Sequence, residues 1–196
     1  MVNKCQQINY RITYGQMNLI NDTRFTLLHL PNWMRQYILS IMMSLPNLEA
    51  VTERLYNVPL EIYHMFLPFF GSVVAERFLN ILTSQITIIG ALANSIKDGD
   101  ITATNENTVK LYENADEFAE FLANLNPFWS FTQWQSLIRQ YLRMIIEIMV
   151  NIASGNYSQE ITVYDRLERH TTIIADYTAY GIMQYFIPSE VPGARE

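Results

Sequence analysis

The chain has 196 residues, a formal net charge of -6 and a single cysteine, Cys5. This length is enough for one domain to bury a substantial core without disulfides or metal staples. The acidic balance and the lack of any Lys/Arg run argue against a nucleic-acid-binding surface, which needs a basic patch. One cysteine excludes an internal disulfide framework and a cysteine-based metal site, and it is compatible with a reducing cytoplasm.

Residues 1–26 show no sustained apolar period, so we predict an irregular N-terminal arm. The arm lacks the apolar segment of a secretory signal, which favours a cytoplasmic protein. The longest uncharged stretch, residues 78–96, is long enough to cross a bilayer. It carries several Asn, Thr, Ser and Gln side chains, so it is better explained as a buried bundle helix, and we expect no membrane association.

Apolar residues recur at helical spacing along much of the remaining chain. The pattern predicts four long helices, at residues 30–45, 72–97, 131–154 and 158–187. Shorter helices are expected at residues 48–56, at 59–70 with Gly71 as its end, and at 104–125 as two consecutive pieces. These elements predict an all-α fold, an up-and-down four-helix bundle with additional short helices, over residues 27–188. Residues 189–196, with Pro192 and Gly193, are expected to form a flexible tail.

A short internal repeat offers a second description of the same bundle. Arg35-Gln36-Tyr37-Ile38 in the first long helix matches Arg139-Gln140-Tyr141-Leu142 in the third. The alternative is therefore two related helical hairpins that arose by duplication.

The predicted helix at residues 131–154 is apolar around most of its circumference. Ser130 and Gln133 form a capping-box pattern that fixes its start. Its polar side chains share one narrow stripe, and about two-thirds of the surface requires burial. The helix therefore needs partners on two sides. Since large exposed apolar surfaces are rare on monomers, we also expect a homodimer formed through helical surfaces.

Motifs for chemistry are sparse. The seven glycines are scattered, with no phosphate-binding loop, and the Glu-x-x-His pairs of di-iron bundles do not occur. No nucleophile–base pair or acid–base constellation is recognisable, so we predict no catalytic residue and no cofactor, and the sequence leaves the question of an enzyme open while favouring a non-catalytic protein. His29, His64 and His170 lie on three separate segments; a zinc site is the alternative to a hydrogen-bonded core histidine at His170.

Four polar residues lie on or beside the inward faces of the long helices: Gln85, Gln140, Glu147 and His170. One hypothesis is that they line a ligand pocket between the helices. The alternatives are a buried hydrogen-bonded layer that fixes helix register, or Gln140 and Glu147 facing water beside Arg143.

An aromatic group opens the same helix. Its members are Phe128, Trp129, Phe131 and Trp134. Their simplest use is to anchor the loop and the core, and a ligand cage is the alternative.

Several motifs resemble those of a family of small, uncharacterised helical proteins from Gram-positive bacteria. The first resemblance lies in Asn114-Ala115-Asp116-Glu117 through Phe121-Leu122 and in Asn126-Pro127-Phe128-Trp129. The second lies in Tyr164-Asp165, Ala175-Asp176 and Gly181-Ile182-Met183-Gln184-Tyr185-Phe186, and the third in Trp33-x-Arg35 followed by Ile38-Leu39-Ser40-Ile41. The similarity covers about residues 27–188 and implies an all-α bundle.

The resemblance also bears on activity and on three positions at which relatives carry histidine. Some members carry an automatic acetylglutamate kinase label, but such kinases resemble open α/β sheets with glycine-rich phosphate loops, and this sequence has neither. Relatives often carry histidines at the positions of Leu30, Gln85 and Gln140. A metal or ligand held by those histidines would be lost or changed in this chain.

Two functions are consistent with these observations. The first is a non-catalytic interaction or structural protein that self-associates through its helices. The alternative is a bundle that binds a small molecule or metal at a polar site in its core.

Overall fold

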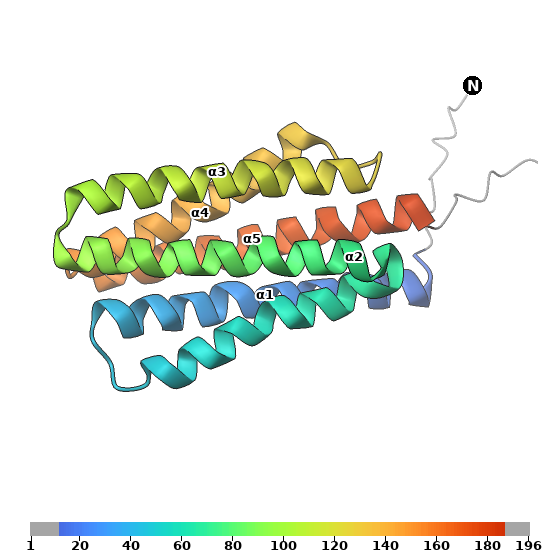
Figure 1. Cartoon of the computed structure of the whole chain (residues 1–196). Helices are drawn as coiled ribbons and strands as arrows, with labels where there is room; N and C mark the ends of the chain where they lie inside the picture. Colours follow the sequence, from blue (N-terminus) through green and yellow to red (C-terminus); the bar gives the residue numbers. More distant parts are fainter. Residues whose placement is uncertain (1–11, 187–196) are drawn as a thin grey trace, which may run out of the picture.

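The computed structural model describes residues 12–186, and this part of the chain is an all-α bundle of five helices without strands (Figure 1). The helices are α1 (Tyr14–Met42), α2 (Leu48–Asp98), α3 (Ile101–Leu125), α4 (Phe131–Ala153) and α5 (Tyr157–Phe186). The predicted tail at residues 189–196 lies outside the described residues. The predicted fold class is confirmed.

Helix α2 folds back on itself at Gly71, where φ is 77° and ψ is 172°. The hydroxyl groups of Tyr56 and Thr87 lie 2.9 Å apart although 31 residues separate them. In a straight helix that separation would be about 45 Å, at roughly 1.5 Å per residue. The rings of Phe66 and Phe78 stack with centroids 4.6 Å apart across the same turn. Residues 48–70 and 72–98 are therefore two antiparallel arms, as Figure 1 shows, and the predicted break at Gly71 is confirmed.

Helix α1 begins at Tyr14, so the prediction of an irregular arm is wrong for residues 14–26. Thr13 and Gln16 form a capping box, in which the Thr13 hydroxyl accepts from the Gln16 amide and the Gln16 side chain accepts from the Thr13 amide. The first turns pack on α5, where Ile20 joins a small apolar cluster with Ala179 and Met183. Tertiary packing stabilises a helix whose own apolar pattern is weak. Residues 1–11 lie outside the described part.

The short helices of the prediction are in fact parts of long ones. Helix α3 runs unbroken for 25 residues from its cap, Asp100, whose carboxylate accepts from the Ala103 amide. The predicted division of residues 104–125 into two pieces is wrong, and Asn114 in the middle of α3 is buried and donates to the Ile81 carbonyl. In α2, Pro59 lies inside a continuous arm. The bundle thus has six long antiparallel segments, counting both arms of α2, where four were predicted.

Helix α4 packs between α3 and α5 and also contacts α1 and α2. Its buried residues are Trp134, Leu137, Ile138, Tyr141, Leu142, Met144, Ile145, Ile148, Met149 and Ile152. The prediction that this helix needs partners on two sides is confirmed. The partners belong to the same chain, so the apolar arc on α4 no longer requires a second copy, and the homodimer stays a prediction.

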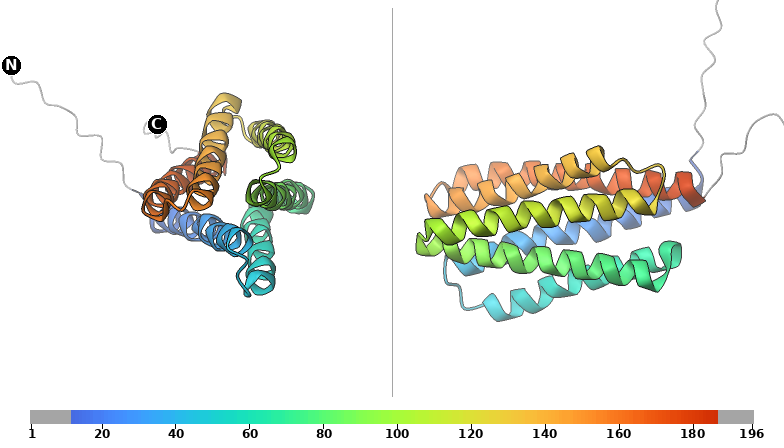
Figure 2. Two further views of the ribbon diagram at one scale, coloured as in Figure 1. Left: turned by 90° about the vertical axis from the view of Figure 1, so that its left-hand side faces the viewer. Right: turned by 45° about the horizontal axis from the view of Figure 1, so that its top comes forward.

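The first and last helices lie side by side and close the bundle (Figure 2). Arg24 in α1 forms a bidentate ion pair with Asp176 in α5, with a shortest distance of 2.6 Å. Arg35 pairs in the same way with Glu160, whose side chain is only 2% exposed. Because α1 meets α5, all five helices surround one interior.

Candidate functional site

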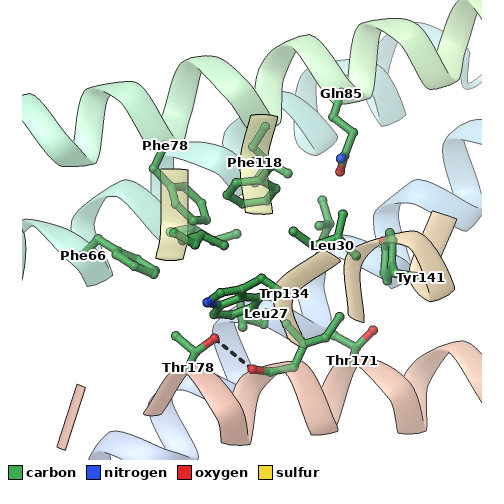
Figure 3. A pocket seen from close by; sticks show the side chains of 15 residues that line it. Leu27, Leu30, Phe66, Phe78, Gln85, Phe118, Trp134, Tyr141, Thr171 and Thr178 are labelled. Carbon is green, nitrogen blue, oxygen red and sulfur yellow. Dashed lines mark hydrogen bonds between the residues drawn. The ribbon is translucent and has the colours of Figure 1, made fainter. Parts of the chain in front are cut away.

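The interior of the bundle contains a cavity lined by 15 side chains from all five helices (Figure 3). The cavity has a volume of about 60 Å³. The lining residues are Leu27, Leu30, Ile62, Phe66, Phe78, Leu82, Gln85, Phe118, Leu122, Trp134, Ile138, Tyr141, Thr171, Ile174 and Thr178. An apolar cavity with a few convergent polar groups is the usual form of a small-molecule site.

Two residues of the wall each have a buried polar atom that lacks a hydrogen-bond partner and does not face the cavity. The two atoms are the indole Nε1 of Trp134 and the hydroxyl of Tyr141, on side chains that belong to residues 2% and 4% exposed. Burial also raises the pKa of Tyr141 above its ordinary value. Since buried polar groups are almost always paired, two orphan groups beside one cavity need an explanation.

The two threonines of the wall are satisfied by their own helix. The hydroxyl of Thr171 donates to the Leu167 carbonyl and that of Thr178 to the Ile174 carbonyl, each at 2.8 Å. Both hydroxyl hydrogens are therefore already bonded. The two oxygens can still accept a hydrogen bond through their lone pairs.

Gln85 is the one predicted site residue that lines this cavity. It is 3% exposed, and its Nε2 donates to the Oδ1 of Asn114 at 3.1 Å. In Figure 3 its amide reaches from α2 toward the space above Leu30, opposite the side occupied by Trp134. The bond to Asn114 fixes the orientation of this amide, as expected for a buried polar residue.

The other three predicted residues lie elsewhere. The Nε2 of His170 is 2.8 Å from the Leu137 carbonyl, a contact between α5 and α4. Glu147 pairs with Arg166 of α5 at 3.4 Å and not with Arg143. Gln140 is half-buried on α4 and is not part of the cavity wall. The four residues therefore do not form one site, and their role in binding is untested.

The histidines of the described residues are separated as well. The Nδ1 of His29 lies 2.7 Å from a carboxylate oxygen of Glu61, while His64 is exposed. Within residues 12–186, no three His, Cys, Asp or Glu side chains come close enough together to hold a metal ion.

The aromatic group before α4 divides into two halves. Phe128 and Phe131 are about half exposed, at 50% and 42%. Trp129 is buried, and its Nε1 donates to the Tyr177 carbonyl at 3.3 Å. Its ring packs edge-to-face on Trp134, with centroids 5.5 Å apart. Trp129 therefore anchors the loop to α5, while Trp134 reaches the cavity.

Two of the stretches that carry the family resemblance touch each other. Asn126 donates to the Gly181 carbonyl at 2.8 Å. A Cβ placed on Gly181 would lie only 1.7 Å from the indole nitrogen of Trp129, so only glycine fits beneath this ring. Leu30 and Gln85 both line the cavity.

Sequence spacing contained a signal for the site residues that the prediction missed. Trp134 and Tyr141 are seven residues apart on α4, and Thr171 and Thr178 are seven apart on α5. Residues seven apart share one helix face. A polar-tipped side chain repeated at that spacing on an otherwise apolar face marks a wall with hydrogen-bonding groups.

A comparison with protein-family models, curated proteins and solved structures finds no match for this chain. In the part of the chain that the structure describes, α2 is the one helix long and apolar enough to cross a membrane, judged by length and composition alone. Core helices of soluble proteins often have the same length and composition.

Proposed function

We propose that this protein is a non-catalytic binding protein that holds a small molecule in the central cavity. The observation that carries the proposal is a cavity of about 60 Å³ inside the bundle, lined almost entirely by apolar side chains from all five helices. A small molecule that fills this space would gain apolar contacts that the empty cavity lacks.

The composition of the wall supports binding without catalysis. Among its residues none is Asp, Glu, His, Lys, Arg, Cys or Ser, and burial raises the pKa of its one tyrosine, Tyr141, which disfavours proton release. The two threonine hydroxyls donate to backbone carbonyls and have no neighbouring base on the wall. The chemistry available to a bound molecule is therefore hydrogen bonding and apolar contact.

Native mass spectrometry of protein purified gently from its own host tests this proposal. We expect a bound mass of one small molecule per chain. Thr171→Leu extends an apolar side chain into the cavity and should remove the bound mass. Thr162→Leu is the matched control, because Thr162 is exposed on the same helix and also donates to a backbone carbonyl, that of Ser158.

A wild-type spectrum without any bound mass would contradict the proposal, and so would a bound mass that survives Thr171→Leu. The same spectrum gives the mass of the assembly, so it also tests the homodimer that the sequence predicts. Self-association and ligand binding are separate properties, and either can be found without the other.

A further inference from the structure

We propose that the molecule held in the cavity is wholly apolar, without charge or hydrogen-bonding groups, and has no more than about four non-hydrogen atoms. This inference rests on the proposed function of the same cavity. It names the chemical class of the ligand from the surface that the wall presents and from the volume that the wall encloses.

The wall is built mainly from hydrocarbon. Ten of its 15 residues, namely four leucines, three isoleucines and three phenylalanines, have side chains without any polar atom. No acidic or basic side chain is among the other five. A charged ligand would lose its hydration without gaining an opposite charge, which is strongly unfavourable in an apolar interior.

The other five wall residues have polar atoms, but these atoms are bonded within the protein or turned away from the cavity. The Trp134 indole N–H and the Tyr141 hydroxyl have almost no accessible surface. The hydroxyls of Thr171 and Thr178 donate to carbonyls of their own helix, and the Gln85 amide donates to a second buried amide. The surface left to face the cavity is therefore almost wholly apolar.

This surface favours a ligand that needs no hydrogen bond. A hydroxyl or carbonyl group that moves from water into an apolar interior without a new partner destabilises the complex. An apolar molecule has no such penalty. It leaves water and gains dispersion contacts with wall atoms that otherwise border empty space.

The volume of the cavity sets the upper limit on the size of the ligand. A single water needs about 10–15 Å³, and an engineered apolar cavity of about 150 Å³ accepts benzene. At about 60 Å³ the cavity lies between these limits. A dissolved gas or a light hydrocarbon fits, and an aromatic ring does not fit without expansion of the core.

Three probes with four non-hydrogen atoms each separate the chemical classes. Isobutane is apolar, 2-propanol has a hydroxyl in place of one of its methyl groups, and acetate is charged. The comparison with 2-propanol is the stringent one, because the oxygens of Thr171, Thr178 and Gln85 still have lone pairs that accept a hydrogen bond.

Each probe is titrated into the full chain labelled with ¹³C at the isoleucine δ1 methyl groups, with isobutane supplied as a gas at stepped pressures. The methyl signals of Ile138 and Ile174 report on the wall, and Ile→Val variants assign them. Ile173 is the internal control, because it is next to Ile174 in the chain but is 55% exposed and lies outside the wall.

We expect isobutane to shift the Ile138 and Ile174 signals saturably, with an affinity about five- to 150-fold higher than that of 2-propanol, as an unbonded buried hydroxyl requires. Acetate should leave both signals unchanged. Thr171→Leu should abolish the isobutane shift, and Thr162→Leu should retain it. Thr171→Val removes the wall hydroxyl with little change of shape and should leave the ratio of the two affinities unchanged.

The apolar class is wrong if 2-propanol binds as tightly as isobutane, if acetate shifts the wall signals saturably, or if Thr171→Val weakens 2-propanol alone. In these cases the proposed function survives, because a molecule still binds in the cavity. If none of the probes binds, the inferred class and size are overturned. The native mass spectrum then decides the function independently: a bound mass removed by Thr171→Leu shows a different ligand, and its absence shows a cavity without a ligand.

Discussion

Tyr141 and Tyr177 show how one atom's partner decides whether a side chain stabilises the fold. The hydroxyl of Tyr141 is buried without a partner, while that of Tyr177 accepts a hydrogen bond of 2.7 Å from the Ser130 amide at the start of α4. Removing an unsatisfied polar atom relieves a desolvation cost, whereas removing a satisfied one leaves its partner unpaired. The same chemical change at the two positions should therefore have opposite effects.

We expect Tyr141→Phe to raise the free energy of unfolding of the ligand-free protein by about 1 kcal/mol, and Tyr177→Phe to lower it by a similar amount. Urea unfolding followed by circular dichroism measures both. A loss of stability in Tyr141→Phe as large as that in Tyr177→Phe would mean that the Tyr141 hydroxyl already has a partner, such as an ordered water.

For a single residue, the helical periodicity predicts whether its side chain faces the core or the solvent, but it does not predict which side chain on another helix it contacts. Gln85 is in the core as its position on the apolar face indicates. The pairing of Glu147 with Arg166 depends on how α4 and α5 are rotated against each other, and no pattern within one helix contains that information. The bond between His170 and the Leu137 carbonyl depends on the same rotation. The candidate site could therefore be predicted only in part.

Among the elements, the two arms of α2 depend on one glycine. The backbone of Gly71 has φ of 77° and ψ of 172°, a region that only glycine adopts at low cost. No atom lies within 4 Å of the place where a Cβ would be, so a side chain there would meet no steric obstacle. The cost of any substitution is then purely one of backbone strain.

Gly71→Ala should therefore lower the free energy of unfolding by about 1–3 kcal/mol. Gly15→Ala is the matched control, because Gly15 also has open space around it but lies in the first turn of α1. That change should raise stability by about 0.5 kcal/mol, since alanine favours the helix. Thermal unfolding compares the two variants with the wild type. Equal effects at both positions would show that the conformation of Gly71 is not strained for alanine.

Most of the helices could be predicted from the sequence, and the incorrect helix boundaries share one cause. The glycine at position 71 and the cap at Ser130 are local signals: the first arm of α2 ends at the glycine and α4 begins after the serine, as those signals predict. The first turns of α1 and the continuity of α3 are determined by packing against other helices, as with Arg24 on Asp176 and Asn114 on Ile81. Tertiary contacts of this kind override weak local preference.

For the molecule as a whole, three tyrosines link stability to alkaline pH. Burial raises the pKa values of Tyr37, Tyr141 and Tyr164 above the ordinary value of about 10. The folded state then keeps protons that the unfolded state has lost. The stability that these protons represent is complete below about pH 10 and is lost as the pH rises above it.

The free energy of unfolding should therefore decrease as the pH rises above 10, by about 1.4 kcal/mol per pH unit for each phenol that stays neutral. Tyr141→Phe should make this decrease less steep. Urea titrations at stepped pH values measure the slopes. An unchanged slope in Tyr141→Phe would exclude Tyr141 as a contributor.

The contact between α1 and α5 also has a consequence for synthesis on the ribosome. Most helices pack on the next one in the chain and can pair as they emerge. The ion pairs of Arg24 and Arg35 can form only after Asp176 and Glu160 have been synthesised, more than a hundred residues later. Thr171 and Thr178 also come from α5, so no incomplete chain has a finished cavity. A nascent chain can be largely helical and still lack the cavity, which forms only when the last helix docks on the first.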